Sequence, residues 1–268
     1  NLLKWEVNRV VVSTLLWSAF IIIMVISSLL FYGQLIEEDM IEQIKPLMET
    51  PLFASMLEAF GIKFDALTNI LGFYVMRNSF FAMLMGSIFS IITAASIVAR
   101  EEYEKTVEFL FSKPLTMIQV LNVKLLAFHA NLLIMNILII LFGYLGLEFF
   151  KIEDYNVSAF LIFSFYTYLL MAAYGSVGLL ISILPKRAKS LFGLSVAIVI
   201  ATYFLEILSN ISESSEFIGY FSPFNYVSQD VVNPNYGFDL VNFIFFAAVI
   251  SVSTIMTYFI YRKRDLII

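Results

Sequence analysis

Long apolar runs separated by short polar segments make up most of the chain. A helix needs roughly 20 apolar residues to cross a bilayer, and six runs are long enough. They cover residues 10–32, 78–99, 120–147, 159–184, 190–208 and 240–261. Because these runs are apolar on most sides, their lengths and flanking residues decide the interpretation. The pattern predicts an all-α integral membrane protein with six transmembrane helices, in one membrane domain that covers residues 1–268.

Further elements are expected outside these spans. Residues 1–9 carry charged side chains and a tryptophan, which predicts a short N-terminal interfacial helix lying along the membrane. In the long connection 33–77, residues 52–60 have apolar positions at helical spacing and predict an amphipathic helix. Residues 209–239 contain short apolar segments broken by Pro223. This connection predicts either a re-entrant outer hairpin before the last span or a folded extracellular loop.

The basic residues choose the orientation. Six spans place both ends of the chain on one side, and 12 of the 16 Lys and Arg residues fall on that side. Lys and Arg are enriched in cytoplasmic loops, so a multi-pass protein of the cell membrane with both termini cytoplasmic is predicted. The composition, 60% hydrophobic and 14% charged, agrees with a membrane protein. No basic stretch is suited to nucleic acid, and the lipid bilayer is the expected environment.

No set of residues predicts a catalytic, cofactor-binding or metal-binding site in this chain. The chain has no cysteine and a single histidine, His129, which lies in the third span near Asn131. Polar groups in a span serve either as part of a transport pathway or as interhelical hydrogen-bonding groups. The chain lacks the G-x-x-x-x-G-K-[ST] loop for ATP, and the middle of each span lacks carboxylates and arginines. If the protein transports a molecule, the energy is expected from another subunit.

The most polar stretch between two spans is residues 100–116. Glu101, Glu104 and Glu108 share one helical face, and Glu101 and Lys105 form a favourable i,i+4 pair. Val107, Leu110 and Phe111 supply an apolar side. Pro114 ends the helix because it lacks an N–H and disfavours helix in the preceding residue. The pattern predicts a short amphipathic helix in the cytoplasm, with a solvated connecting loop as the alternative.

This stretch resembles the coupling segment of the membrane permease subunits of type-2 ABC transporters, a family of exporters. The family pattern is approximately E-x-x-x-G-T-x-E-x-L-L-S-x-P-[VIL]-[ST], followed by a Lys that enters the next span. The matching residues are Glu101, Glu102, Thr106, Glu108, Leu110, Ser112, Pro114, Leu115, Thr116 and Lys124. Lys105 replaces the usual Gly, and Met117 stands where Arg is common. The chain end, residues 261–266, also resembles the closing Y-x-[KR]-[KR]-D-[LI] of this family.

The resemblance implies a cytoplasmic coupling helix that docks on a separate ATP-binding subunit. The implied coupling residues are Glu101, Glu102, Glu104, Lys105, Thr106, Val107, Glu108, Leu110, Phe111 and Pro114. Two ABC ATP-binding subunits are expected, and they rather than this chain would bind ATP and Mg²⁺. A second permease subunit is also expected, as a homodimer or related heterodimer that contacts the second and fifth spans. The small residues of the second span suit such a contact.

The implied function is that of a permease subunit, not an enzyme, which forms half of the pathway of an ATP-driven exporter. Candidate pathway residues are His129, Asn131, Tyr203 and Phe204. The aromatic and aliphatic composition favours an amphipathic peptide, drug or lipid-like cargo. An alternative is a sensor or regulatory subunit that reports a ligand to its ATPase. An intramembrane enzyme is disfavoured because no acid–base or metal set is present.

Overall fold

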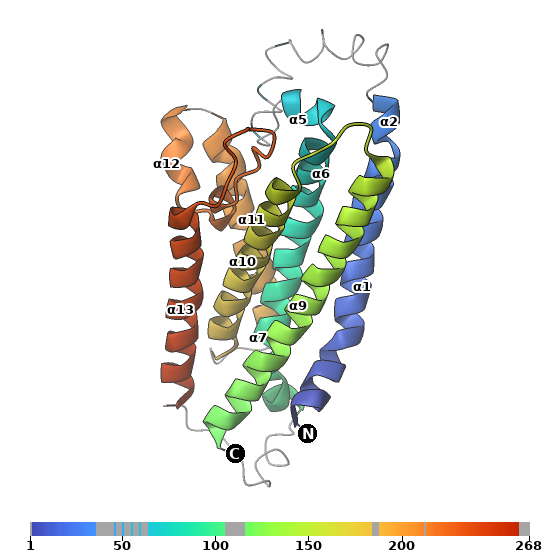
Figure 1. Cartoon of the computed structure of the whole chain (residues 1–268). Coiled ribbons are helices and arrows are strands. Elements are labelled where there is room, and N and C mark those ends of the chain that lie inside the picture. Colours follow the sequence, from blue (N-terminus) through green and yellow to red (C-terminus); the bar gives the residue numbers. More distant parts are fainter. Residues whose placement is uncertain are drawn as a thin grey trace.

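The computed structural model describes residues 2–35, 46, 50, 55, 59, 64–104, 116–183, 188–211 and 213–262. Within these residues the chain is helical, without strands, and six helices are long and apolar enough to cross a membrane. The prediction of an all-α protein with six spans is therefore confirmed. Leu2 and Arg262 lie at the same end of the bundle, which we call the terminal end, and the opposite end is the distal end (Figure 1).

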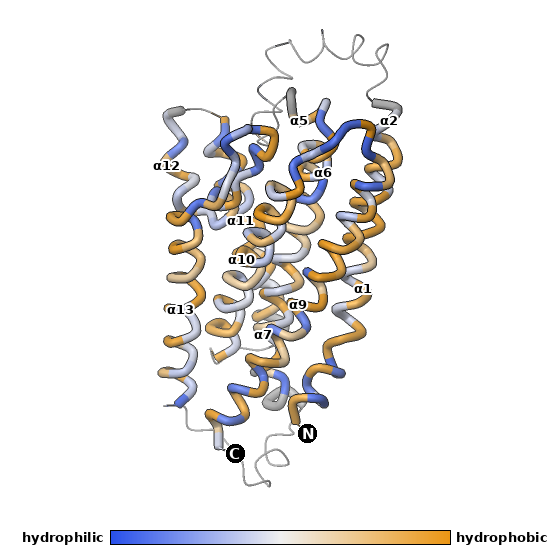
Figure 2. Tube along the Cα trace, in the orientation of Figure 1, coloured by the Kyte–Doolittle hydropathy of each residue, from blue (hydrophilic) through white to orange (hydrophobic). Residues whose placement is uncertain are grey.

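The spanning helices run nearly side by side (Figure 1). They are α1 (Leu2–Leu30), the continuous run of α6 (Ile70–Asn78), a π-helical segment (Ser79–Met85) and α7 (Gly86–Glu104), then α9 (Met117–Phe150), α10 (Val157–Ser182), α11 (Ala188–Asn210) and α13 (Leu240–Arg262). The short elements are α2 (Tyr32–Leu35), α5 (Phe64–Thr68), α12 (Glu216–Gly219) and the 3₁₀ turns Glu213–Ser215 and Pro223–Tyr226. Hydrophilic residues gather toward both ends of the bundle, and the middle is largely hydrophobic (Figure 2).

The second and fourth spans form the centre of the bundle. In each of them 67% of the most apolar window is buried inside the chain, compared with 17% in the fifth and sixth spans. α10 packs closely along α7 and also contacts α13, whereas α1 pairs with α9. α1 and α13 therefore lie at opposite edges of the bundle (Figure 1). Most of the apolar surface of α11 and α13 is left for lipid or another protein.

Small residues allow the close approach of α7 and α10. A Cβ atom on Gly178 would overlap the backbone carbonyl oxygen of Ile91, and one on Gly175 would overlap the Ser90 hydroxyl on α7 as well as the Phe128 ring on α9. The Ser90 hydroxyl donates a hydrogen bond of 2.5 Å to the backbone carbonyl of Met171. Without a hydrophobic driving force between helices in lipid, such close contacts and hydrogen bonds hold helices together. The small residues of the second span thus pack against other helices of this chain. Their size is therefore not a reason to place the second span against a second permease, as was expected from the sequence.

Local signals set several helix boundaries. Thr116 begins α9 with a capping box: its hydroxyl accepts from the Gln119 N–H at 3.2 Å, and the Gln119 side chain accepts from the Thr116 N–H at 2.9 Å. Asn156 caps α10 by accepting a hydrogen bond from the Ala159 N–H at 3.1 Å. These caps satisfy backbone donors that have no partner within the helix. The third span consequently begins at Met117, earlier than the predicted residue 120.

The separate interfacial helix predicted for residues 1–9 is wrong. These residues form the first turns of α1, which continues without a break for 29 residues. No proline or glycine interrupts the run, and the Glu6 side chain is 1% exposed because it packs into the bundle. Trp5 is exposed, as an interfacial anchor would be, and the Arg9 guanidinium lies 4.8 Å from the centre of its ring.

The second span begins at Ile70, eight residues before the predicted Asn78. Asn69 caps this helix by accepting hydrogen bonds from the Leu71 and Gly72 N–H groups. Arg77, expected in a loop, therefore lies on the helix, and its guanidinium sits 5.4 Å from the centre of the Phe73 ring. The amphipathic helix predicted for residues 52–60 lies almost entirely outside the described residues.

The segment that follows α11 turns back on itself at the distal end. α12 packs against the end of α11, and the turn Pro223–Tyr226 then leads toward α13 (Figure 1). Phe224, in that turn, is buried against Tyr174 and Tyr203, with ring centres at 5.5 and 5.3 Å. The geometry is that of a folded helical hairpin. Its re-entry into the membrane stays a prediction.

Replacing Gly178 with Ala should destabilise the chain. The new Cβ must push α10 away from the Ile91 carbonyl, and overpacking of this kind costs about 1–3 kcal/mol. Thermal unfolding of the purified protein, followed by the fluorescence of its two tryptophans, should show a lower midpoint. Gly193→Ala on α11 is the matched control, because no atom lies within 4 Å of a Cβ placed there. Equal midpoints for the two variants would contradict the packing described for α7 and α10.

Candidate functional site

The structure describes the two helices on either side of the predicted coupling segment. Glu101, Glu102 and Glu104 belong to the last turns of α7, and α9 begins at Met117. The other predicted coupling residues, Lys105, Thr106, Val107, Glu108, Leu110, Phe111 and Pro114, lie outside the described residues. The coupling helix therefore stays a prediction, and what the structure shows is how α7 and α9 are held.

A buried lysine joins three helices at the terminal end. The Lys124 ammonium on α9 lies 3.0 Å from a Glu6 carboxylate oxygen on α1 and donates a hydrogen bond of 2.6 Å to the Ile97 carbonyl on α7. The side chains of Lys124 and Glu6 are each 1% exposed. The contact with Ile97 lies about two turns before the end of α7, and Lys124 lies about two turns after the start of α9. The helices that enter and leave the predicted coupling segment are thus fixed to each other and to α1.

Burial makes this ion pair sensitive to the loss of either partner. Removing one partner of a buried pair leaves an uncompensated charge and typically costs about 3–5 kcal/mol. Replacing both partners with apolar residues of similar volume is often neutral or stabilising. We therefore interpret the pair as an interaction that fixes the axial register of three helices. It is not interpreted as a source of net stability.

A second polar layer joins α1 to α9 about two turns deeper in the bundle. The Thr14 hydroxyl donates to the Asn131 side-chain oxygen at 3.0 Å, and the Asn131 amide donates to the carbonyls of Ala127 at 2.9 Å and Val7 at 3.4 Å. Asn131 is 1% exposed. Its geometry agrees with interhelical hydrogen bonding, one of the two alternatives for this candidate pathway residue. At the terminal end of α13, the Tyr258 hydroxyl donates to Asn122 and ties that helix to α9.

The remaining candidate pathway residues lie on two different helices. His129, on the terminal half of α9, is half-buried with its ring edge against Phe128, 5.1 Å away. Tyr203, on the distal half of α11, packs against Phe224, whereas its neighbour Phe204 is 57% exposed on the outside of the bundle. The structure does not bring His129 together with Tyr203 and Phe204. Among the described residues no group of three or more His, Asp or Glu side chains could hold a metal ion.

Two features of the site were not predicted. The prediction places Glu6 at an interface, although a lysine inside an apolar run, as Lys124 is, pairs with an acidic side chain or a backbone carbonyl. This pattern signals a buried partner for Lys124 but does not identify Glu6 as that partner. The π-helical segment Ser79–Met85 has no comparable signal, since its residues are ordinary for a transmembrane helix. Such segments occur frequently at functional sites, and this one begins next to Asn78, a buried residue whose side-chain oxygen has no hydrogen-bond partner.

Lys124→Met should strongly destabilise the chain, by about 3–5 kcal/mol, because it leaves the Glu6 carboxylate buried without its partner. Adding Glu6→Leu to this variant should restore much of the loss, and thermal unfolding measures both. Lys151→Met is the control, since Lys151 forms ion pairs with Glu148 and Asp154 at the exposed distal end; little change is expected there. A double variant less stable than either single variant would show that the pair is not the source of the sensitivity.

The sequence comparisons agree with this architecture. A search of curated proteins finds no match to the chain. A family model described as ABC-2 family transporter protein matches residues 1–266. This match covers nearly the whole chain, including all six spans and the segment between α7 and α9. Members of this permease family are transmembrane components of transporters and are not themselves catalytic. The chain belongs to the ABC-2 family of transporter proteins.

Proposed function

We propose that this chain is the transmembrane subunit of an ATP-driven exporter, coupled to separate ATP-binding subunits through residues 101–114. The observation that carries the proposal is the attachment of the two helices that flank this segment. Lys124 holds α9 to α7 and to α1 at the terminal end, with both side chains of its ion pair buried. A displacement of the segment would therefore move three helices together rather than bend a single connection. Membership of the ABC-2 family supports the same assignment.

The proposed complex contains two ATP-binding subunits and a second permease, identical or related. ATP and Mg²⁺ would be bound by the ATP-binding subunits. The exposed apolar face of α11, which has only 17% of its most apolar window buried inside the chain, supports a contact between permeases there. The cargo is proposed to be an amphipathic peptide, drug or lipid-like molecule, because the bundle presents mainly aromatic and aliphatic side chains.

The orientation can be tested by thiol labelling, since the chain has no cysteine of its own. Ser112→Cys, in the coupling segment, should react with a membrane-impermeant reagent only after the cells are permeabilised. Ser158→Cys is the matched position, because Ser158 is exposed at the distal end, and it should react in intact cells. Labelling of Ser112→Cys from outside intact cells would invert the proposed topology.

Reversing charge in the coupling segment should uncouple the permease from its ATPase. The ATP-binding subunit would first be identified by affinity purification and mass spectrometry. In the reconstituted complex, Glu104→Lys combined with Glu108→Lys should reduce cargo-stimulated ATP hydrolysis at least about tenfold, because like charges at a protein interface cost several kcal/mol. Glu153→Lys changes an exposed carboxylate at the distal end and should leave hydrolysis unchanged. Full stimulation in the double variant would count against the coupling role.

A further inference from the structure

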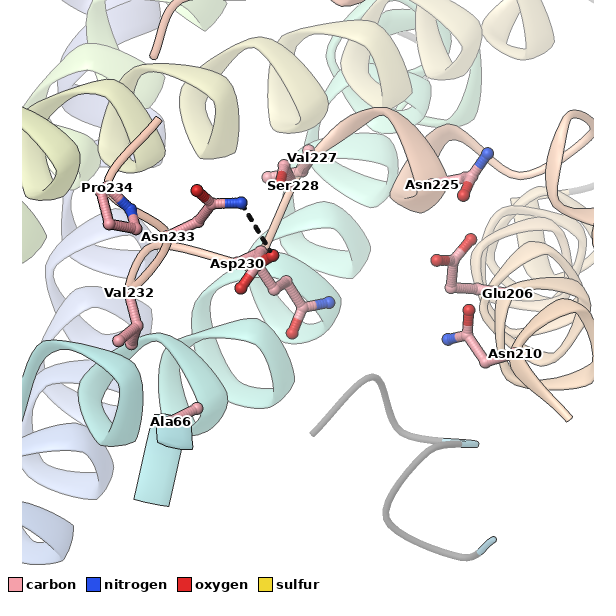
Figure 3. A pocket seen from close by; sticks show the side chains of 11 residues that line it. Ala66, Glu206, Asn210, Asn225, Val227, Ser228, Asp230, Val232, Asn233 and Pro234 are labelled. Carbon is pink, nitrogen blue, oxygen red and sulfur yellow. Dashed lines mark hydrogen bonds between the residues drawn. The ribbon is translucent and has the colours of Figure 1, made fainter. Parts of the chain in front are cut away.

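The distal end of the bundle contains a cavity of about 450 Å³, between the end of α11 and residues 225–234 (Figure 3). This volume is within the range of small-molecule binding sites. α11 contributes Glu206 and Asn210 to its wall. The irregular segment before α13 contributes Asn225, Gln229, Asp230 and Asn233.

The wall chemistry favours a positively charged ligand. The polar side chains just named are two carboxylates and four carboxamides, and no Lys or Arg is among the described residues that line the cavity. Asp230 already interacts within the chain, since the Asn233 amide lies 3.5 Å from its carboxylate. Of the two carboxylates in the wall, Glu206 is therefore the one left to bind a ligand. Near the cavity, burial raises the pKa of the Tyr236 hydroxyl, so this hydroxyl stays neutral and donates to the Ser228 carbonyl at 3.1 Å.

Glu206 has an unmet hydrogen-bonding requirement. Its carboxylate reaches from α11 into the space between that helix and residues 225–234 (Figure 3). The Oε2 atom is buried and has no hydrogen-bond partner. A buried polar atom without a partner is costly, and more so when it is charged. A ligand that donates a hydrogen bond and carries positive charge would remove this cost.

A smaller cavity of about 20 Å³ continues from the same place toward the centre of the bundle. It shares Glu206, Asn210 and Gln229 with the larger cavity and adds the aromatic rings of Tyr203 and Phe224. These two rings meet edge to face, with their centres 5.3 Å apart. Aromatic rings attract ammonium groups, and a carboxylate accepts a charge-assisted hydrogen bond from them, so this small space suits an ammonium group. The other wall of this small cavity comes from Ser79 and Met83 of the π-helical segment.

We propose that the distal cavity binds an organic cation, with its ammonium group paired to Glu206 beside the rings of Tyr203 and Phe224 and its apolar part in the larger cavity, against Val227 and Val232. The binding itself depends only on the cavity. A role for it as a site where cationic amphipathic cargo dwells before release rests on the proposed export function. A small metal ion is a poor match, because a cavity of this volume with a single available carboxylate cannot surround one.

The test uses the purified full chain in nanodiscs of zwitterionic phosphatidylcholine, without an ATP-binding subunit. Benzylammonium is the probe, and benzyl alcohol and benzoate are neutral and anionic probes of the same shape. Binding is titrated by saturation-transfer NMR. The unaltered chain should bind benzylammonium at least about tenfold more tightly than benzyl alcohol, which corresponds to one charge-assisted hydrogen bond, and should bind benzoate least.

Glu206→Gln should abolish the preference for the cation. Glu216→Gln is the matched control, since Glu216 is an exposed carboxylate on α12, outside the cavity wall, and it should keep the preference. Equal affinities for the three probes on the unaltered chain, or an unchanged preference in Glu206→Gln, would overturn the proposal. The probe comparison needs no variant and so stays decisive if Glu206→Gln does not fold. Loss of ATPase coupling in the preceding experiment would leave this binding unaffected, so the two proposals fail independently.

Discussion

The burial of the Lys124 ammonium is the constraint on which the terminal end of this bundle depends. A charged side chain that is only 1% exposed is stable only if groups that pair with it are buried beside it. One partner, Glu6, comes from the first helix, and another, the Ile97 carbonyl, comes from the second span. The first helix and the two helices that flank the segment proposed to contact the ATPase are thereby fixed in axial register, within two turns of that segment. This requirement also explains why the first residues continue α1 instead of lying flat on the membrane.

A second constraint acts at the centre, where α7 and α10 approach closely over glycine and serine positions. Gly178 leaves room for the Ile91 backbone on α7, and Gly175 leaves room for Ser90 on α7 and for the Phe128 ring on α9. The Ser90 hydroxyl donates to the Met171 carbonyl across the α7–α10 interface. Because these two spans bury their apolar residues in each other and in α9 and α11, the outer helices retain exposed apolar faces. The bundle thus combines a closely packed centre with α11 and α13 at its outside, where lipid or a second permease can cover them.

The parts of the fold that depend on length and composition could be predicted from the sequence. All six spans were located, because roughly 20 apolar residues have few other structural uses. The errors arose where a polar residue lies inside the bundle. Glu6 was assigned to the membrane surface because its charge could not be matched with Lys124 across more than a hundred residues. The hydrophobic pattern predicts that the second span begins at Asn78, whereas the cap at Asn69 starts that helix. The coupling residues were identified by resemblance to a family motif, and the distal cavity, formed by segments that approach only in three dimensions, was not predicted.

Among the described residues, buried carboxylate and carboxamide groups are paired differently at the two ends of the bundle, and this difference bears on how the protein would move. At the terminal end the buried charges of Glu6 and Lys124 are paired, and Asn131 has hydrogen-bond partners on its own helix and on α1. Toward the distal end, the Asn78 Oδ1 and Glu206 Oε2 atoms are buried without partners; the hydroxyls of Ser87 and Ser195, elsewhere in the bundle, also have none. Ser79, which follows Asn78 and begins the π-helical segment, lines the same small cavity as Glu206. Unpaired buried atoms raise the free energy of the conformation that contains them, so a rearrangement that pairs them is favoured. A displacement applied to the well-paired terminal end would therefore be transmitted by rigid helices and would change the structure most readily around Glu206 and the π-helical segment.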